Sequence, residues 1–210
     1  MLEIPEEEWW TELVEPKRRE NFLFACRTPG LWLHRASTHK YAADILYEIA
    51  FQASERQFAR MKSGDLKSGA LEGQALQDFR DSFLLQEYLL LAGYALECLT
   101  KGYLLAIIPE LVDNRIDKIV ATHDLSGLFH ECGVQVTDEE NKLLKLMTRH
   151  ITWGKYTAPR DLRHMPSFTL EDQREKSLAI SNPFHGRRVQ ILVNSMYEQM
   201  ATMLDECRNK

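Results

Sequence analysis

The segment from Phe83 to Ile108 constrains the fold more than any other part of this 210-residue chain. Its apolar residues cover much of the circumference of a helix, so a helix formed here has to be buried on several sides. Glu87, Glu97 and Lys101 interrupt the run, whereas a membrane span needs about 20 nearly uncharged residues. The segment therefore predicts the central helix of an all-α domain that does not span a membrane.

Other segments show the three- and four-residue spacing of amphipathic helices. In the first of these, Ala42, Ile45, Leu46, Ile49 and Ala53 form the apolar stripe that we expect to face inward. No useful length of β-type alternation occurs. The expected helices span about residues 37–61, 78–107, 110–121, 125–131, 137–151 and 186–207.

The caps and the inward residues of the later helices can also be predicted. Asp124 is a plausible cap for the short helix, and Gly133 would end it. Thr137 and Glu140 form a capping box, in which each side chain satisfies an orphan backbone N–H of the other. The helix that follows would turn Leu143, Leu144 and Met147 inward. In the last helix the expected inward residues are Val189, Leu192, Val193, Met196, Met200, Met203 and Leu204.

The remaining segments lack a clear period and contain Pro and Gly. Residues 1–35 predict an irregular extension that packs on the domain, and residues 36–208 predict the helical bundle itself. Residues 63–77 predict a flexible connection. Residues 153–185 predict a long loop before the last helix, and a loop of that length is often functional.

Charge and cysteine content narrow the class of protein. A net charge of −5 lacks the excess of Lys and Arg that is typical of a general DNA binder. Residues 149–188 are locally basic, which indicates either a modest positive patch or scattered solvated charges. The four cysteines are far apart in sequence and favour free thiols in a reducing compartment. Without a signal-peptide pattern, we expect a cytoplasmic protein.

Glu97 and Lys101 are the most informative charged residues. They lie four apart on the most apolar helix and therefore share a face. Inside an apolar surround a charge costs several kcal/mol unless it is paired, which predicts a mutual ion pair, a basic group from another helix, or a ligand. The alternative is a surface pair that contributes a few tenths of a kcal/mol.

Two further motifs carry polar side chains. Arg149 and His150 end one predicted helix, where cations favour the helix dipole, and Lys155 and Tyr156 follow. Together they would form a pocket for a phosphate or a nucleic-acid backbone, with Tyr156 stacking on a base. His123-Asp124 invites a metal interpretation, but a capping Asp beside an ordinary His explains it better, and we expect no metal site.

The order of these segments resembles the HEPN superfamily. Gly93-Tyr-Ala-Leu-Glu97-Cys-Leu-Thr-Lys101 resembles the core helix of that family. His123-Asp-Leu-Ser-Gly-Leu128 and Trp153-Gly-Lys-Tyr-Thr157 resemble the two motifs that follow it, with Lys155 in place of an Arg and Thr157 in place of a Pro. The resemblance covers roughly residues 37–205. It implies a four- to five-helix bundle, a homodimer, and a prokaryotic role linked to RNA, nucleotides or defence.

Many members of that family are metal-independent ribonucleases with an Arg and a His separated by four to six residues near a late helix. Here that separation occurs at Arg27 and His34, ahead of the first predicted core helix, which is the wrong place. Near the last helix His185 precedes Arg187, in reversed order. The family's catalytic signature is therefore missing where it is expected.

The sequence thus leaves three hypotheses. The leading one is a HEPN-like dimeric binding protein for a nucleotide, RNA or a protein partner, in a defence or toxin–antitoxin setting and without a cofactor. Its expected site residues are Glu97, Lys101, Arg149, His150, Lys155 and Tyr156. The second is a metal-independent ribonuclease that uses a rearranged pair, either Arg149 with His150 or His185 with Arg187. The third is a structural dimeric interaction module with no ligand.

Overall fold

The computed structural model describes residues 15–64, 72–113, 115–153 and 183–208. Over these residues the protein is all-α, and its one β feature is an isolated bridge between Val112 and Ile116. In chain order the elements are α2 (Glu15–Arg27), α3 (Pro29–Ser63), α4 (Gly73–Ser82), α5 (Leu84–Ile107), the 3₁₀ turn η2 (Pro109–Leu111), α6 (Leu125–Glu131), α7 (Asp138–Trp153) and α9 (Pro183–Arg208).

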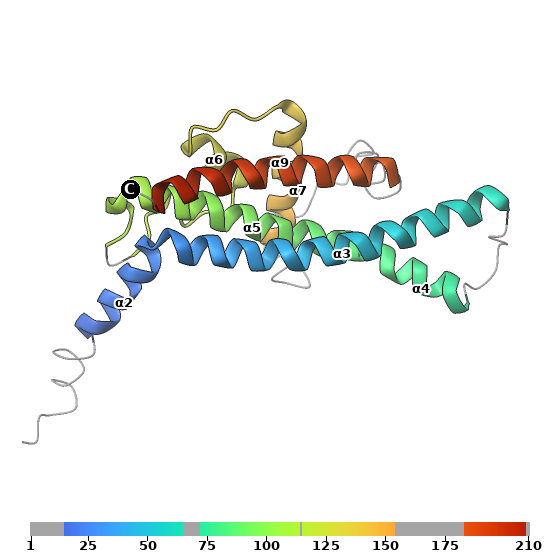
Figure 1. The fold of residues 1–210 in the computed structure, drawn as a ribbon, viewed down its shortest axis with the longest axis horizontal. Helices are drawn as coiled ribbons and strands as arrows, with labels where there is room; N and C mark the ends of the chain where they lie inside the picture. Colours follow the sequence, from blue (N-terminus) through green and yellow to red (C-terminus); the bar gives the residue numbers. More distant parts are fainter. Residues whose placement is uncertain (1–14, 65–71, 114, 154–182, 209–210) are drawn as a thin grey trace, which may run out of the picture.

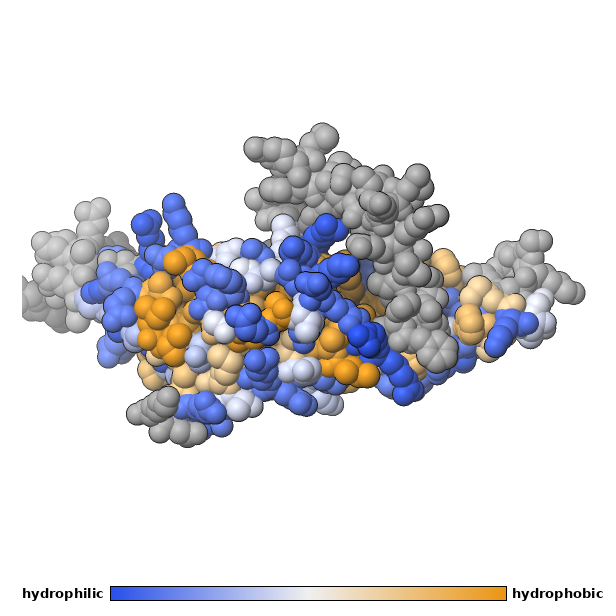
Figure 2. All heavy atoms as spheres, turned by 90° about the horizontal axis from the view of Figure 1, so that it is seen from above, coloured by the Kyte–Doolittle hydropathy of each residue, from blue (hydrophilic) through white to orange (hydrophobic). Residues whose placement is uncertain are grey.

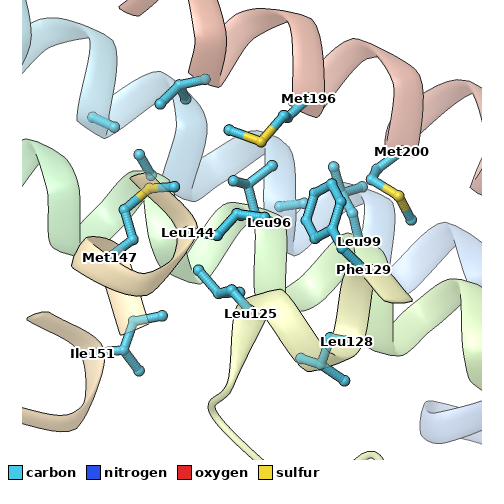
Figure 3. Close-up of a cluster of buried hydrophobic side chains, with 14 of the residues drawn as sticks. Leu96, Leu99, Leu125, Leu128, Phe129, Leu144, Met147, Ile151, Met196 and Met200 are labelled. Carbon is cyan, nitrogen blue, oxygen red and sulfur yellow. The ribbon is translucent and has the colours of Figure 1, made fainter. Parts of the chain in front are cut away.

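The central helix is α5, as its apolar composition predicts. Figure 1 shows α3 and α9 running alongside α5, with α6 and α7 against it. The C-terminal part of α3 continues past the end of α9 and pairs with α4. Side chains from α5, α6, α7 and α9 meet in a core that includes Leu96, Phe129, Met147 and Met196 (Figure 3). The predicted inward residues Leu143, Leu144 and Met147 of α7 are all buried.

Two glycines allow helices to approach α5 closely. A Cβ built on Gly102 would lie 2.5 Å from Cβ of Trp32 on α3. One built on Gly93 would lie 3.0 Å from Cδ1 of Ile151 on α7. A side chain at either position would push the neighbouring helix outward, because a packed core has little free volume to absorb it.

The N-terminal region differs from the prediction. Residues 15–27 form α2, and α3 begins at Pro29, so the expected boundary at residue 35 falls inside a helix. Pro29 occupies the first helical turn, where its missing N–H costs nothing, and therefore starts the helix instead of breaking it. The indole of Trp32 donates a hydrogen bond to the Cys26 carbonyl across the joint between α2 and α3. The part of the predicted extension over residues 1–14 lies outside the described residues.

The predicted helix over 78–107 is divided into two. α4 begins earlier, at Gly73, and Phe83 separates it from α5. At the joint, the N–H groups of Phe83 and Gln86 donate to carbonyls three residues back, which tightens the turn. The glycine-rich connection is correspondingly shorter: Gly64 ends α3 in the left-handed conformation, and residues 65–71 lie outside the described residues.

The weak helix expected over 110–121 is absent. Only η2 forms, and the chain then follows turns that bury Val112 and Val120. The guanidinium of Arg27 donates to the carbonyls of Pro109 and Val112, so a side chain from α2 satisfies backbone groups that a helix would otherwise pair.

The later helices follow the prediction more closely. The capping box is confirmed: the Thr137 N–H donates to Glu140 Oε2 at 2.8 Å, and the Glu140 N–H donates to Thr137 Oγ1 at 3.3 Å. Gly133 has φ +72° just after α6. The last helix is a few residues longer than expected, and its stripe is buried at Val193, Met196, Met200 and Leu204 and half-buried at Val189, Leu192 and Met203. The expected loop over 154–182 lies outside the described residues.

The inward stripe predicted for α3 is displaced around the helix. Ile45 and Ile49 are 45% and 40% exposed, whereas Ala43 and Tyr47 are buried. Of the same predicted stripe, Ala53 is buried and Ala42 and Leu46 are half-buried. The prediction for this helix was therefore right in part, and wrong for the two isoleucines.

Figure 2 shows apolar side chains among hydrophilic ones on the face seen from above. Residues 73–107 are long and apolar enough to cross a membrane by length and composition. However, 56% of their most apolar window is buried inside the bundle, which is typical of a core helix. The interruption at Phe83 also separates α4 from α5 within this stretch.

Candidate functional site: a buried carboxylate among cations on α5

The candidate site is the face of α5 that carries Tyr94, Glu97, Cys98 and Lys101, called here the α5 polar face. Positions i, i+3, i+4 and i+7 lie on one side of a helix, so the sequence itself places these four side chains together. Three of them are half-buried, and Glu97 is 8% exposed. A carboxylate this deep in an apolar bundle needs partners, because an unpaired buried charge costs several kcal/mol.

Glu97 has two such partners. Nζ of Lys101 donates to Oε1 of Glu97 at 2.7 Å, and each of these side chains is 11% exposed. Nδ1 of His123 lies 3.1 Å from Oε1 and 3.0 Å from Oε2 of the same carboxylate. The prediction of an interior ion pair is therefore confirmed, and the alternative of a surface pair is wrong.

His123 reaches Glu97 from the segment before α6. The Asp124 N–H donates to Thr122 Oγ1, and the Leu125 N–H donates to Thr148 Oγ1 on α7, so the two residues that follow His123 are fixed. Asp124 occupies the N-cap position, but its side chain makes no capping bond. The predicted cap position of Asp124 is therefore confirmed without a capping side-chain bond, whereas His123 is not an ordinary neighbour, because it contacts Glu97.

Helix α3 adds Arg35 and His39 beside the α5 polar face. The His39 ring contacts the Tyr94 ring, with centroids 5.7 Å apart and planes at 40°. Burial, and then the charge of Arg35, lower the pKa of His39, against the opposing effect of Glu97. Burial and Glu97 raise the pKa of Cys98 to about 11, although Arg35 and Lys101 act in the opposite direction.

The charges of this cluster do not balance. Among the described residues of this cluster, the acid Glu97 is paired with Lys101, and the permanent charge of Arg35, an exposed residue of α3, acts on Cys98 and His39 as well. His39 and His123 add two imidazoles. A surplus of positive charge beside a low-dielectric interior favours an anion, because Coulomb interactions strengthen as the effective dielectric constant falls. The arrangement is thus chemically suited to holding a phosphate or carboxylate group.

The structure does not bring all the predicted site residues to this face. Met147 and Ile151 contact α5 at Gly93, and Arg149 lies two residues from each of them. Two residues correspond to about 200° around a helix, so Arg149 is on the side of α7 away from α5, where it is exposed. His150 is half-buried and lies nearer the α5 side. Lys155 and Tyr156 lie outside the described residues.

The other proposed catalytic pair lies at the start of α9. His185 is in its first turn, and the guanidinium of Arg187 lies over the Phe51 ring of α3, 4.8 Å from the centroid. This cation–π contact gives Arg187 a packing role between α9 and α3. Arg188, next in the chain, pairs with Glu139 at the start of α7.

Sequence reasoning missed three residues of the site: Arg35, His39 and His123. No spacing rule joins them to Glu97, because they come from a different helix and from a segment 26 residues later. Within the part of the chain that the structure describes, no group of three or more His, Cys, Asp or Glu side chains is arranged to hold a metal ion.

Comparison with protein-family models, curated proteins and solved structures found no match. The resemblance to the HEPN superfamily therefore depends on this chain's own motifs and on the order of its helices.

Proposed function

We propose that this protein is a HEPN-like binding protein that holds a phosphate-bearing ligand, a nucleotide or RNA, on the α5 polar face. The observation that carries the proposal is the buried Glu97 carboxylate paired with Lys101 at 2.7 Å and with His123 at 3.0 Å, beside Cys98, on which the charge of Arg35 acts. Glu97 orients Lys101 and His123, and Lys101 and Arg35 supply the charge that attracts the ligand. The protein acts as a homodimer in the cytoplasm, in a prokaryotic defence setting.

The energetics favour a binding role over a purely structural one. A buried ion pair is weak evidence for stability, since well-packed apolar residues in its place are often neutral or stabilising. The permanent charge of Arg35 acts on the adjacent Cys98 in addition to the Glu97–Lys101 pair, and it is this further cation that an anionic ligand would use.

Isothermal titration calorimetry with nucleoside monophosphates and with short RNA tests the proposal. Lys101→Ala and Arg35→Gln should each lower the affinity at least tenfold, because each removes a charge-assisted contact. Lys145→Ala is the matched control, since Lys145 is an exposed cation on α7. The proposal fails if both site variants bind as the unaltered protein does, or if no phosphate-bearing compound binds.

The same samples test the ribonuclease hypothesis. Incubation with RNA in the presence of a chelator, followed by gel analysis, would reveal metal-independent cleavage. Cleavage that disappears in His150→Ala or His185→Ala would establish an enzyme at those residues. A persistently intact substrate, together with binding that depends on Lys101, is the result expected for a binding protein.

A further inference from the structure

Helix α4 packs with its polarity reversed. Its buried residue is the charged Asp78, which pairs with Arg56 and Arg60 of α3. Phe79 and Phe83, by contrast, are 43% and 51% exposed, and their rings contact each other edge to face with centroids 5.1 Å apart. A surface helix ordinarily turns its apolar side toward the protein. The apolar side of α4 is therefore left for another partner.

Helix α3 adds to the same apolar surface. Arg60 of α3 contacts Asp78 of α4. Met61 and Phe79 directly follow these two residues, so each lies about 100° further around its helix. Because α3 and α4 run antiparallel, both rotations lead to one side of the helix pair (Figure 1). Residues 55–63 of α3 together with α4, called here the arm, thus have an apolar side, on which Met61 is 56% exposed.

The apolar side of the arm begins where α9 ends. Near the start of α9, the guanidinium of Arg187 covers the Phe51 ring of α3. Phe58 lies seven residues, or about two turns, further along the same face of α3 and is 41% exposed. The arm continues past α9 at this point (Figure 1). A helix laid on the arm would take, against α3, the place that α9 takes further back along the helix.

The exposed apolar surface of the arm has the size of one half of a protein interface. Its four large side chains each leave about half of their surface open: Phe58, Met61, Phe79 and Phe83. At about 150–250 Å² for a large side chain, they expose roughly 400 Å² together. A standard interface covers about 800 Å² on each partner, of which about 57% is apolar. The arm therefore supplies the apolar share of one partner, and the arm of a second copy supplies the other.

The charges beside this surface are self-complementary. Glu55 and Lys62 are exposed and lie three residues before and four residues after Phe58. Nζ of Lys62 is 5.9 Å from the centroid of the Phe58 ring. A twofold axis that crosses α3 at Phe58 makes the two copies of α3 antiparallel. Glu55 of each copy then meets Lys62 of the other, which gives two ion pairs at the edge of the apolar surface.

We propose that the arm is the dimerisation surface of this protein, and that two copies interlock by packing the apolar sides of their arms around a twofold axis at Phe58. The two arms form an antiparallel four-helix bundle, in which each α4 buries the rings that it exposes in a single copy. The inference rests on the homodimer of the proposed function and adds the surface that forms it. The ligand and the α5 polar face play no part in it.

Sedimentation velocity of the purified protein over a concentration series measures the dimer dissociation constant. Met61→Glu buries an unpaired charge in the interface and should raise this constant about 100-fold or more. Glu55→Lys sets two lysines against each other and should raise it about tenfold, and adding Lys62→Glu should restore it to within about threefold. Circular dichroism checks that each variant is folded. Tyr41→Glu is the control, since Tyr41 is 71% exposed on α3 outside the arm.

The outcomes separate this inference from the proposed function. A dimer that is unaffected by Met61→Glu and by Glu55→Lys would overturn the inference and leave the homodimer in place. A monomer at every concentration would overturn both the inference and the homodimer. A monomer that co-sediments with phosphatidylcholine vesicles, and loses this binding in Met61→Glu, would overturn the inference in favour of a lipid surface. The calorimetric titrations described above test the ligand independently of the arm.

Discussion

Asp78 provides the sharpest stability prediction. It is fully buried in α4 and accepts hydrogen bonds from Arg56 Nε and Gln74 Nε2, both at 2.9 Å, and Nη1 of Arg60 lies 2.6 Å from its other oxygen. Burial alone would raise the pKa of Asp78, but the hydrogen bonds from Arg56, Gln74 and Arg60 outweigh it and lower the pKa to about 2. This carboxylate thus fixes α4 to the C-terminal part of α3.

The magnitude of this contribution follows from the pKa. A decrease from the ordinary value of 3.8 to about 2 corresponds to roughly 2 kcal/mol, at about 1.36 kcal/mol per unit. Removing one partner of a fully buried ion pair costs about 3–5 kcal/mol. Here the side chains of Arg56 and Arg60 are 45% and 26% exposed and can regain water, which favours the lower figure. Asp78→Asn should therefore cost about 2 kcal/mol at pH 7.

The sign of the pH dependence is fixed by the lowered pKa. A carboxyl group with a lowered pKa in the folded state stabilises the protein fully above its unfolded pKa, near 4, and loses that effect as the pH falls through about 2. The difference in unfolding free energy between the unaltered protein and Asp78→Asn should thus be constant from pH 7 to 5. It should shrink to less than half by pH 2.5.

Urea denaturation followed by circular dichroism at each pH gives this difference, and hydrogen exchange of the α4 amides shows whether the loss is local. Asp81→Asn is the matched control: Asp81 lies on the same helix and accepts an exposed hydrogen bond from Gln77, so its replacement should change stability by less than about 0.5 kcal/mol. A pH-independent difference, or a cost for Asp78→Asn no larger than that of the control, would refute the reasoning.

Three further predictions concern packing, capping and thiol chemistry. Gly102→Ala should lower the unfolding free energy by about 1–3 kcal/mol, because the added Cβ would clash with Trp32. Gly30→Ala is the control and should not lower the unfolding free energy, because the space around Gly30 is open. Thermal denaturation measures both variants. Thr137→Ala removes one half of the capping box of α7 and should cost about 1 kcal/mol, measured in the same way, and an unchanged melting temperature would contradict the role of the cap. With its pKa raised to about 11, the Cys98 thiol should react with a disulfide reagent at pH 8 on the order of 100-fold more slowly than in urea, and equal rates would show that the thiol is not shielded.

The resemblance to the HEPN superfamily, the homodimer and the ligand remain predictions. The all-α class is confirmed over the described residues. Periodicity was enough for α6, α7 and α9 because each of these helices has a distinct apolar stripe and a clear start or stop residue. It was right only in part on α3, where Ala53 is buried as predicted but Ile45 and Ile49 are exposed. The buried side of this helix combines alanines with Tyr47 and Phe51, a mixture of sizes that depends on how α3 packs and that a hydrophobicity pattern does not rank.

In the candidate site, too, some features follow from helical spacing and others from the packing of separate segments. A spacing of four residues is enough to place Glu97 and Lys101 on one face of the most apolar helix, because position around a helix is a local property. The pairing of His123 with Glu97, the contact of His39 with Tyr94 and the place of Arg149 on the far side of α7 follow from the folded structure alone. Those contacts depend on how separate segments pack against α5. The separation of two residues along the chain does not indicate whether packing will bring them together.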